Sequence, residues 1–299
     1  MTTVDWIAVD WGTSNLRVWG MSDSGTVLQE ACSDNGMSKL SRDGFEPALL
    51  ALIDDWITDQ TTVLACGMVG ARQGWAEAPY QRTPCAPITT RTGQPEVRDA
   101  RLDVHIIPGV AQDDPADVMR GEETQIAGFM TLNPNWDGVV CLPGTHTKWA
   151  HVSAGEIVSF QTAMTGDLFA SISEHTVLRH SVAADGIEQE GFLAAVEETL
   201  GRPERLAGRL FNIRAEGLLN ALEPKAARAR LSGYLIGAEL AATKPYWLGQ
   251  QVAVIGASGL SKLYVDALAA QSVMATAAQA ERITLAGLTA AYRTLKEGR

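Results

Sequence analysis

"IAVDWGTSNLRVWG", residues 7–20, decides how the start of the chain folds. The apolar run before Asp10 predicts a strand, and the run from Leu16 to Trp19 predicts its returning partner. Between the two strands lies a turn of small and polar residues: Gly12, Thr13, Ser14 and Asn15. An ordinary β-hairpin explains the turn but not Asp10, because a carboxylate is costly to bury without a partner. Asp10 becomes useful if it faces a hydrated Mg²⁺ ion while the N–H groups of residues 12–15 surround a phosphate.

Composition limits the classes of protein that fit. The chain has 299 residues, of which 46% are hydrophobic and 20% charged, so we expect one large folded domain or two ordinary ones. The net charge of −11 argues against a nucleic-acid partner, because a phosphate backbone requires a basic surface. No signal peptide and no apolar run of about 18 residues is present, so we expect a cytoplasmic protein without a membrane partner. The scattered cysteines predict buried reduced thiols rather than disulfides or a zinc site: Cys32, Cys66, Cys85 and Cys141.

The opening pattern returns in residues 138–160, as strand, Gly/Thr turn, strand, turn and strand. This repeat predicts a duplicated α/β fold in which each half is a β-meander plus helices, with a cleft between two lobes. We expect an N-terminal lobe at 1–130 and a C-terminal lobe at 131–299, with the last helix available to pack back on the N-terminal lobe. Further helices are predicted at 43–58, 115–132, 165–180, 188–200, 203–222, 224–244 and 279–297, and further strands at 61–67, 104–109, 251–259 and 272–276.

Two later Gly-rich stretches are candidates for nucleotide contacts. "LPGTHTKW" (142–149) lacks the acid at the strand end, so it is not a second metal site of the same kind. Its glycine and threonines allow close approach to a phosphate and its lysine adds charge, whereas His146 is expected to be structural. "VIGASGLSKLY" (254–264) predicts a strand, a turn and a helix N-terminus that can lie against adenosine or the α-phosphate. The residues expected to contact ATP here are Gly144, Thr145, Thr147, Lys148, Gly256 and Ser258.

Three carboxylates are candidates for a catalytic base. A kinase that acts on a hydroxyl needs a carboxylate close to the attacking oxygen. "MRGEETQ" (119–125) offers Glu122 and Glu123, and we favour Glu122 because Gly121 leaves space for a substrate. Successive helical positions point about 100° apart, so one of the two glutamates faces a cleft squarely. "MTGDLF" (164–169) offers Asp167, which equally suits the first turn of a helix.

Together these motifs resemble the 2-dehydro-3-deoxygalactonokinase family of bacterial sugar-acid kinases, over almost the whole chain. The resemblance implies an actin-like ATPase (ribonuclease H-like) fold. It also implies ATP-dependent phosphorylation of 2-dehydro-3-deoxy-D-galactonate at O6, with Mg²⁺, in galactonate breakdown. Position 167 is where we expect glutamate as a variant; aspartate keeps the charge but shortens the reach. The alternatives are a kinase of the same fold that acts on another sugar, and an actin- or chaperone-like nucleotide-binding protein. A homodimer is possible.

An anionic substrate gives a role to "GMVGARQGWAEAPY", residues 67–80. Its glycines allow a ligand to approach the backbone closely, and Arg72 could pair with a carboxylate through two hydrogen bonds. The alternative is that Arg72 is a surface residue of a loop. The residues expected to bind substrate are Gly67, Met68, Val69, Gly70 and Arg72.

Overall fold

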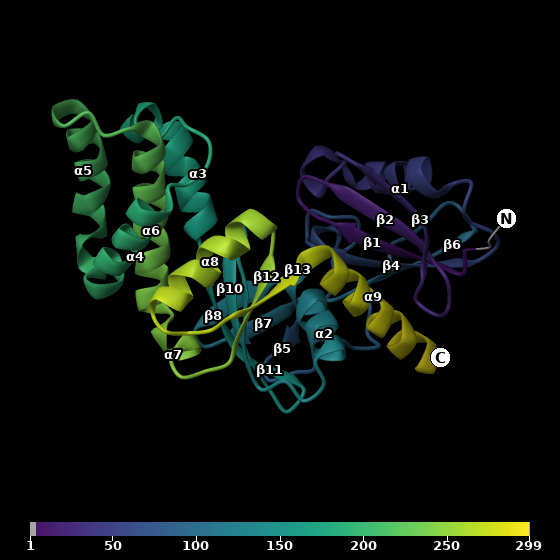
Figure 1. Cartoon of the computed structure of the whole chain (residues 1–299). Helices are drawn as coiled ribbons and strands as arrows, with labels where there is room; N and C mark the ends of the chain where they lie inside the picture. The colour runs from purple at the N-terminus through teal and green to yellow at the C-terminus, as the bar shows by residue number, and fades with distance from the viewer. Residues whose placement is uncertain (1–3, 299) are drawn as a thin grey trace. The chain divides into compact units, whose positions relative to one another are not determined.

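The computed structural model describes residues 4–298 and divides into two compact units (Figure 1). Unit 1 comprises the described parts of Met1–Trp136, Val152–Ser159 and Ala280–Arg299, and unit 2 comprises Asp137–His151 and Phe160–Gln279. The sequence placed the boundary between residues 130 and 131, whereas the first segment of unit 1 continues to Trp136. Within residues 4–298, no helix has the length and apolar character needed to cross a membrane.

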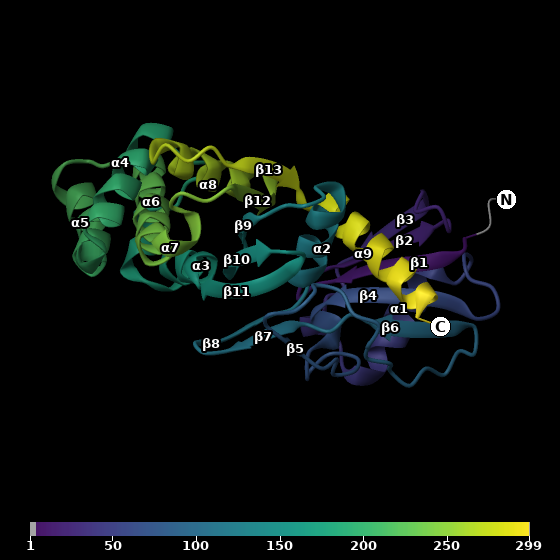
Figure 2. The same ribbon diagram turned by 90° about the horizontal axis from the view of Figure 1, so that it is seen from below.

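Unit 1 is built on a five-stranded sheet of order β3-β2-β1-β4-β6 (Figure 2). Its strands are β1 (Trp6–Trp11), β2 (Leu16–Met21), β3 (Val27–Ser33), β4 (Thr61–Gly67) and β6 (Leu102–Ile106). The first three strands form an antiparallel meander, and β1, β4 and β6 run parallel. The predicted opening hairpin is therefore confirmed, with Asp10 directly opposite Arg17 in the register.

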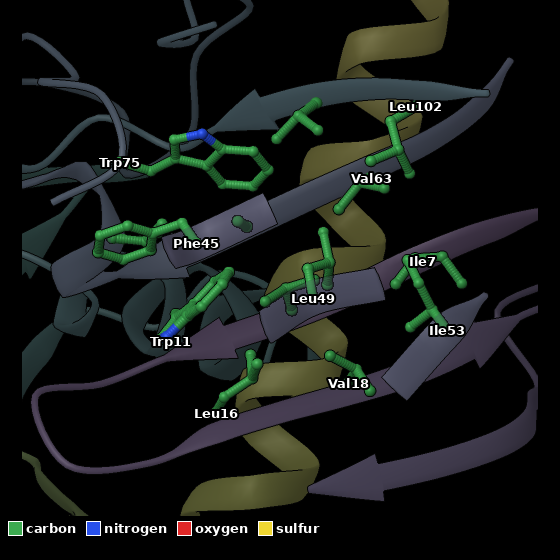
Figure 3. Packing of buried hydrophobic residues seen from close by; sticks show 14 of the residues in the cluster. Ile7, Trp11, Leu16, Val18, Phe45, Leu49, Ile53, Val63, Trp75 and Leu102 are labelled. Carbon is green, nitrogen blue, oxygen red and sulfur yellow. The ribbon is translucent and has the colours of Figure 1, made fainter. Parts of the chain in front are cut away.

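The alternation of side chains along β1 gives this sheet two buried faces. Ile7, Val9 and Trp11 join the cluster with α1 (Phe45–Ile53). Figure 3 shows Ile7 and Trp11 among the packed side chains of this cluster. Trp6 and Ala8 point to the other face, where they pack with α9 (Ala280–Glu297). Asp10 follows Trp6 and Ala8 in the period-two pattern, so the strand directs its carboxylate toward the α9 face.

Helix α2 (Glu122–Leu132) packs closely against α9 within unit 1. A Cβ on Gly287 would lie 1.9 Å from the Thr124 carbonyl oxygen, and one on Gly128 would lie 1.9 Å from the Ile283 carbonyl oxygen. Only glycines at these two positions permit the observed approach of the two helix backbones. The second helix is therefore fixed by the last one along the chain.

The helix predicted over 115–132 is wrong in its first part. Residues 116–119 form β8 (Ala116–Met119), which pairs with β7 (Val110–Asp113), and β7 also pairs with β5 (Gln81–Arg82). This three-stranded sheet is absent from the sequence prediction. Gly121 has φ +107°, a conformation outside the α-helical region, so α2 begins only at Glu122.

A second five-stranded sheet, of order β11-β10-β9-β12-β13, lies mostly in unit 2 and reproduces the order of the first; Val152–Ser159, where β10 ends and β11 begins, is counted with unit 1. A run of three consecutive strands is again followed by two parallel strands. The predicted duplication is confirmed. The strands are β9 (Gly138–Leu142), β10 (Thr147–Ser153), β11 (Glu156–Ala163), β12 (Val252–Gly256) and β13 (Thr276–Gln279), so the last lies four residues later than predicted.

Helices pack around the sheet of unit 2 and supply much of its core. They are α3 (Thr165–His175), α4 (Gln189–Gly201), α5 (Leu206–Leu219), α6 (Pro224–Ala242), α7 (Lys244–Trp247) and α8 (Ser258–Ala270). All four cysteines are free, as expected, but Cys32 is exposed and Cys85 is half-buried, so the expectation that all are buried is wrong for these two. Cys32 lies on β3, whose alternate side chains face solvent.

Candidate active site

Asp10 lies near the end of β1 and is ion-paired. Its Oδ2 accepts a hydrogen bond from Arg17 Nη2 at 2.6 Å, and its Oδ1 lies 4.0 Å from Cys66 Sγ. Burial raises the pKa of the Asp10 carboxyl, and the charge of the Arg17 guanidinium opposes that shift. The Arg17 guanidinium therefore reaches the acid at the strand end.

The first turn presents an exposed and well-braced backbone. Thr13, Ser14 and Asn15 are exposed, and the Gly12 N–H donates to the Asn15 carbonyl at 3.0 Å. The backbone N–H groups of residues 37 and 38 donate to the carbonyls of Gly12 and Thr13, both at 3.0 Å. The segment behind the turn therefore occupies those carbonyls and fixes the loop shape. Such a loop suits an anion, since preset N–H groups need no reorganisation.

The two glutamates at the start of α2 have different environments. Glu122 is half-buried, and its Oε2 accepts a hydrogen bond from the Arg120 N–H at 3.0 Å. Glu123 is fully buried and accepts from the Gly121 N–H at 2.7 Å and the Thr124 hydroxyl at 3.0 Å. Burial, together with the neighbouring Glu122 charge, raises the pKa of Glu123 to about 7. Of the pair, Glu122 has the exposed surface that contact with a substrate requires.

The 67–80 segment begins at the last residue of β4, and its first four residues are largely enclosed. Gly67, Val69 and Gly70 are buried and Met68 is half-buried. Arg72, by contrast, is exposed: its side chain is 81% exposed and its Nε lies 3.7 Å from the Glu77 carboxylate. The structure thus places Arg72 on the surface of the loop, away from the buried glycines beside it.

Arg120 is a feature that the sequence analysis missed. Its guanidinium is buried, donates to the Ala78 carbonyl at 2.9 Å and lies 4.4 Å from the centre of the Tyr80 ring. Its Nε and Nη1 atoms have no hydrogen-bond partner among the described residues. A buried cation that supports the 67–80 segment could have been suspected from its place in "MRGEETQ", directly before the two glutamates.

In unit 2, the second turn is joined to the start of α3. The Asp167 N–H donates to the Thr145 carbonyl at 2.9 Å, and a Cβ on Gly166 would lie 2.3 Å from the Gly144 carbonyl oxygen. The Asp167 carboxylate lies 3.7 Å from His146 Nε2, and both side chains are about half exposed. The structure therefore brings Asp167 next to the second turn, with its carboxylate accessible.

Two residues expected at this turn face the interior instead. Thr147 is fully buried and its hydroxyl is hydrogen-bonded to the Tyr264 hydroxyl at 2.9 Å. Lys148 is also buried and its Nζ donates to the Thr162 hydroxyl at 2.8 Å. The expectation that both present polar groups at the turn surface is corrected, because β10 begins at Thr147 and carries both side chains into the fold. Gly144 and Thr145 are the accessible part of the turn.

A cavity of about 440 Å³ lies beside the second turn, within unit 2. Gly144, Thr145 and Thr165 are among the residues that line it, while Leu235, Ile236 and Leu263 are among its apolar walls. Mostly apolar walls with a few convergent polar groups are typical of small-molecule sites. The apolar walls come mainly from α3, α6 and α8. The sequence analysis singled out the stretch 254–264, which supplies the α8 wall, but missed the α6 wall because it also patterns as helix core.

At the β12–α8 joint, the two residues expected to contact ATP are not the ones that line the cavity. Gly256 is half-buried and Ser258 is exposed, and the part of α8 that lines the cavity lies further along the helix. The buried Ser261 hydroxyl has no hydrogen-bond partner among the described residues. A Cβ on Gly256 would lie 2.9 Å from that hydroxyl oxygen, so the glycine keeps the joint compact.

The duplicated sheets define an actin-like ATPase fold, the class that includes sugar kinases. The activator of the 2-hydroxyisocaproyl-CoA dehydratase from Clostridium difficile, solved with bound ADPNP, superposes with a TM-score of 0.51 at 11% identity, over 98% of this chain and 96% of that one. Residues 10–291 match the family model of 2-keto-3-deoxy-galactonokinase. The chain belongs to this family and is a phosphotransferase with an alcohol group as acceptor.

Individual relatives agree over nearly their full lengths. A protein from Rhizobium meliloti named for 2-dehydro-3-deoxygalactonokinase activity is 39% identical, over 99% of each chain. The 2-dehydro-3-deoxygalactonokinase of Escherichia coli is 33% identical, over 96% of this chain and 97% of that one. The crystal structure of a candidate 2-dehydro-3-deoxygalactonokinase from Sinorhizobium meliloti has a TM-score of 0.91 at 40% identity, covering 97% of this chain and 99% of the other.

Proposed function

We propose that this kinase transfers the γ-phosphoryl group of ATP to O6 of 2-dehydro-3-deoxy-D-galactonate, a step of galactonate catabolism. The observation that carries the proposal is the match along 99% of the chain to a relative named for this activity. The two accessible turns, one in each unit, support it, because phosphoryl transfer depends on positioning and charge stabilisation more than on covalent chemistry.

Asp10 is proposed to hold Mg²⁺ through water. The Asp10 carboxylate is sufficient as a protein ligand for this ion, because Mg²⁺ keeps several waters and takes its other ligands from substrate phosphates. No group of three or more His, Cys, Asp or Glu residues within 4–298 forms a dedicated metal site. When bound, the ion neutralises charge on the phosphates. Residues 13–15 would then present N–H and hydroxyl groups to the same phosphates, and Gly12, whose N–H is bonded to the Asn15 carbonyl, would keep the turn closed.

The cavity of unit 2 is proposed to take the adenosine part of ATP. Its apolar walls suit a purine ring, and its lining includes Gly144 and Thr145, where phosphates would follow. The unpartnered Ser261 hydroxyl lies at the neighbouring joint with Gly256. In this arrangement the predicted β12–α8 joint, with Gly256 and Ser258, lies near the nucleotide. The helices that wall the cavity form the rest of the nucleotide site.

Glu122 is proposed as the catalytic base, with Asp167 assisting in sugar binding. Glu123 is disfavoured because its carboxylate is fully buried and held by two local donors. The base must come within hydrogen-bond distance of the attacking hydroxyl, but its pKa need not be strongly raised. In a loose transition state the proton leaves late, so the position of the base matters more than its basicity.

The 67–80 segment is proposed to bind the sugar acid, with Arg72 as the partner of its carboxylate. Arg72 is exposed and its contact with Glu77 is long, so that ion pair contributes little free energy. A substrate carboxylate can therefore replace Glu77 as the partner of Arg72 at little cost. Arg120 supports the segment from behind through its contacts with Ala78 and Tyr80. A homodimer and a cytoplasmic location stay predictions from the sequence.

Coupled measurement of ADP release, with a panel of acceptors, tests the function. The panel contains 2-dehydro-3-deoxy-D-galactonate, its C4 epimer, a neutral hexose and an amino sugar. The proposal expects the highest kcat/KM for a 2-dehydro-3-deoxy sugar acid. Faster turnover of the neutral or amino sugar would favour another kinase of this fold, and ATP hydrolysis unaffected by every acceptor would contradict a kinase role.

A further inference from the structure

The carboxylate of Glu239, on α6, is buried without a cationic partner. Its side chain is 5% exposed, and no ion pair in residues 4–298 includes it. Trp149 Nε1 donates to its Oε1 at 2.7 Å, and the Tyr264 hydroxyl donates to its Oε2 at 2.8 Å. The Thr165 side chain also hydrogen-bonds to it. The Thr147 hydroxyl acts one step away, because Tyr264 donates its only hydroxyl proton to Glu239 and therefore accepts from Thr147 at 2.9 Å. Three donors from outside α6 thus converge on one carboxylate.

These donors belong to the elements that enclose the cavity of unit 2. Trp149 lies on β10, Thr165 is the first residue of α3, and Tyr264 lies on α8. Two of the three, Thr165 and Tyr264, line the cavity themselves. The carboxylate thus lies directly behind the cavity wall and connects a strand and two helices to α6.

The same connections reach the second turn from both of its ends. β10 begins at Thr147, right after the turn residues 144–146. α3 begins at Thr165, and two residues later the Asp167 N–H holds the Thr145 carbonyl. Any shift of β10 or α3 relative to α8 would change the spacing between this turn and the cavity wall.

Stability alone gives a weak reason for this arrangement. Well-packed apolar residues usually replace a buried charged network at little cost, or even stabilise the fold. Such networks do specify a unique arrangement of the groups they join. We infer that Glu239 is a positioning residue for nucleotide binding, which fixes the cavity wall at Tyr264 and Thr165 to the second turn. This inference rests on the proposed nucleotide site in unit 2.

Glu239→Gln tests the inference with little change in side-chain volume. The substitution removes the charge: the one glutamine oxygen accepts from Trp149, and the NH₂ group faces Tyr264, which must then accept instead of donating. The charge-assisted hydrogen bond from Tyr264 is therefore lost. We expect the Kd for ADP, measured by calorimetry, and the KM for ATP each to rise about tenfold, which is the effect of losing one charge-assisted hydrogen bond. The KM for the sugar acid should stay within about twofold, a split that general destabilisation does not produce.

Two further variants keep the test decisive. Tyr264→Phe removes the hydroxyl that donates to Glu239 and keeps the ring in the cavity wall. It should also weaken ADP binding, and it replaces Glu239→Gln as the test variant if that protein does not fold. Thr199→Val is the matched control, because Thr199 is fully buried on α4, hydrogen-bonds to two carbonyls and does not line the cavity. It should lower the unfolding midpoint and leave the Kd for ADP unchanged.

Each outcome separates the inference from the function. Unchanged ADP affinity in folded Glu239→Gln and Tyr264→Phe overturns the inference and leaves the proposed function intact. Equal weakening by Thr199→Val also overturns it, because any loss of stability in unit 2 would then have the same effect. If the wild-type protein binds no ADP, the proposed nucleotide site fails and the inference fails with it.

Discussion

Replacing Glu123 by glutamine should remove a pH dependence of stability that the buried carboxylate creates. Glu123 accepts hydrogen bonds from the Gly121 N–H at 2.7 Å and the Thr124 hydroxyl at 3.0 Å. A glutamine can keep both contacts, since its oxygen accepts from Gly121 and its NH₂ group donates to the threonine oxygen. The substitution therefore changes the charge at this position and little of the packing.

The size and sign of the effect follow from the pKa. Burial, the larger cause, and the Glu122 charge raise the pKa of Glu123 to about 7 from its usual 4.5. The folded protein thus binds a proton more tightly than the unfolded chain, so this contribution to stability is complete below pH 4.5 and is lost as the pH rises through 7. The shift corresponds to ~3 kcal/mol between the two limits.

Urea unfolding followed by tryptophan fluorescence measures this difference. Glu123→Gln should match the wild-type protein near about pH 4 and exceed its free energy of unfolding by ~3 kcal/mol near about pH 8. Glu174→Gln, at an exposed position on α3, serves as the control and should follow the wild-type curve. Parallel curves for wild-type protein and Glu123→Gln would refute the reasoning, since Glu123 would then not titrate in this range. The variant should also retain turnover, because its side chain is closed to substrate.

Four further substitutions test the proposed roles of site residues. Asp10→Asn should lower kcat by orders of magnitude at saturating Mg-ATP while the circular dichroism spectrum is kept, and near-normal turnover would remove Asp10 from the metal role. Arg72→Ala should raise the KM for the sugar acid far more than the KM for ATP; equal changes, or none, would exclude Arg72 as the carboxylate partner. Glu122→Gln should lose the single-turnover chemical step with sugar affinity within a few-fold. If Asp167→Asn shows that loss instead and Glu122→Gln stays active, the two roles are reversed.

Much of the fold could be predicted because the hydrophobic patterns repeat. The opening stretch and residues 138–160 carry the same alternation and the same turns, and they form meanders with the same strand order. The helix over 115–132 failed because residues 116–119 pair with a neighbouring strand, and short strands of that kind depend on partners distant in sequence.

The candidate site was less accessible to sequence reasoning. Turn motifs indicate where a backbone is free, and both turns are accessible at the expected positions. Burial of individual side chains depends on what covers each face of a strand. Thr147 and Lys148 point to opposite faces of β10 and are both buried, because both faces of that part of the strand are covered. The carboxylate of Glu239 escaped notice because a single glutamate within a helix has no local signal; its donors lie on three other elements.

The position of the transferred phosphate tests the central claim most directly. Purified protein is incubated with Mg-ATP and 2-dehydro-3-deoxy-D-galactonate, and the products are analysed by ³¹P and ¹H NMR. The account predicts one phosphomonoester, coupled to the protons on C6, formed in equal amount with ADP. Phosphate on another oxygen, or ADP with inorganic phosphate as the only products, would contradict it.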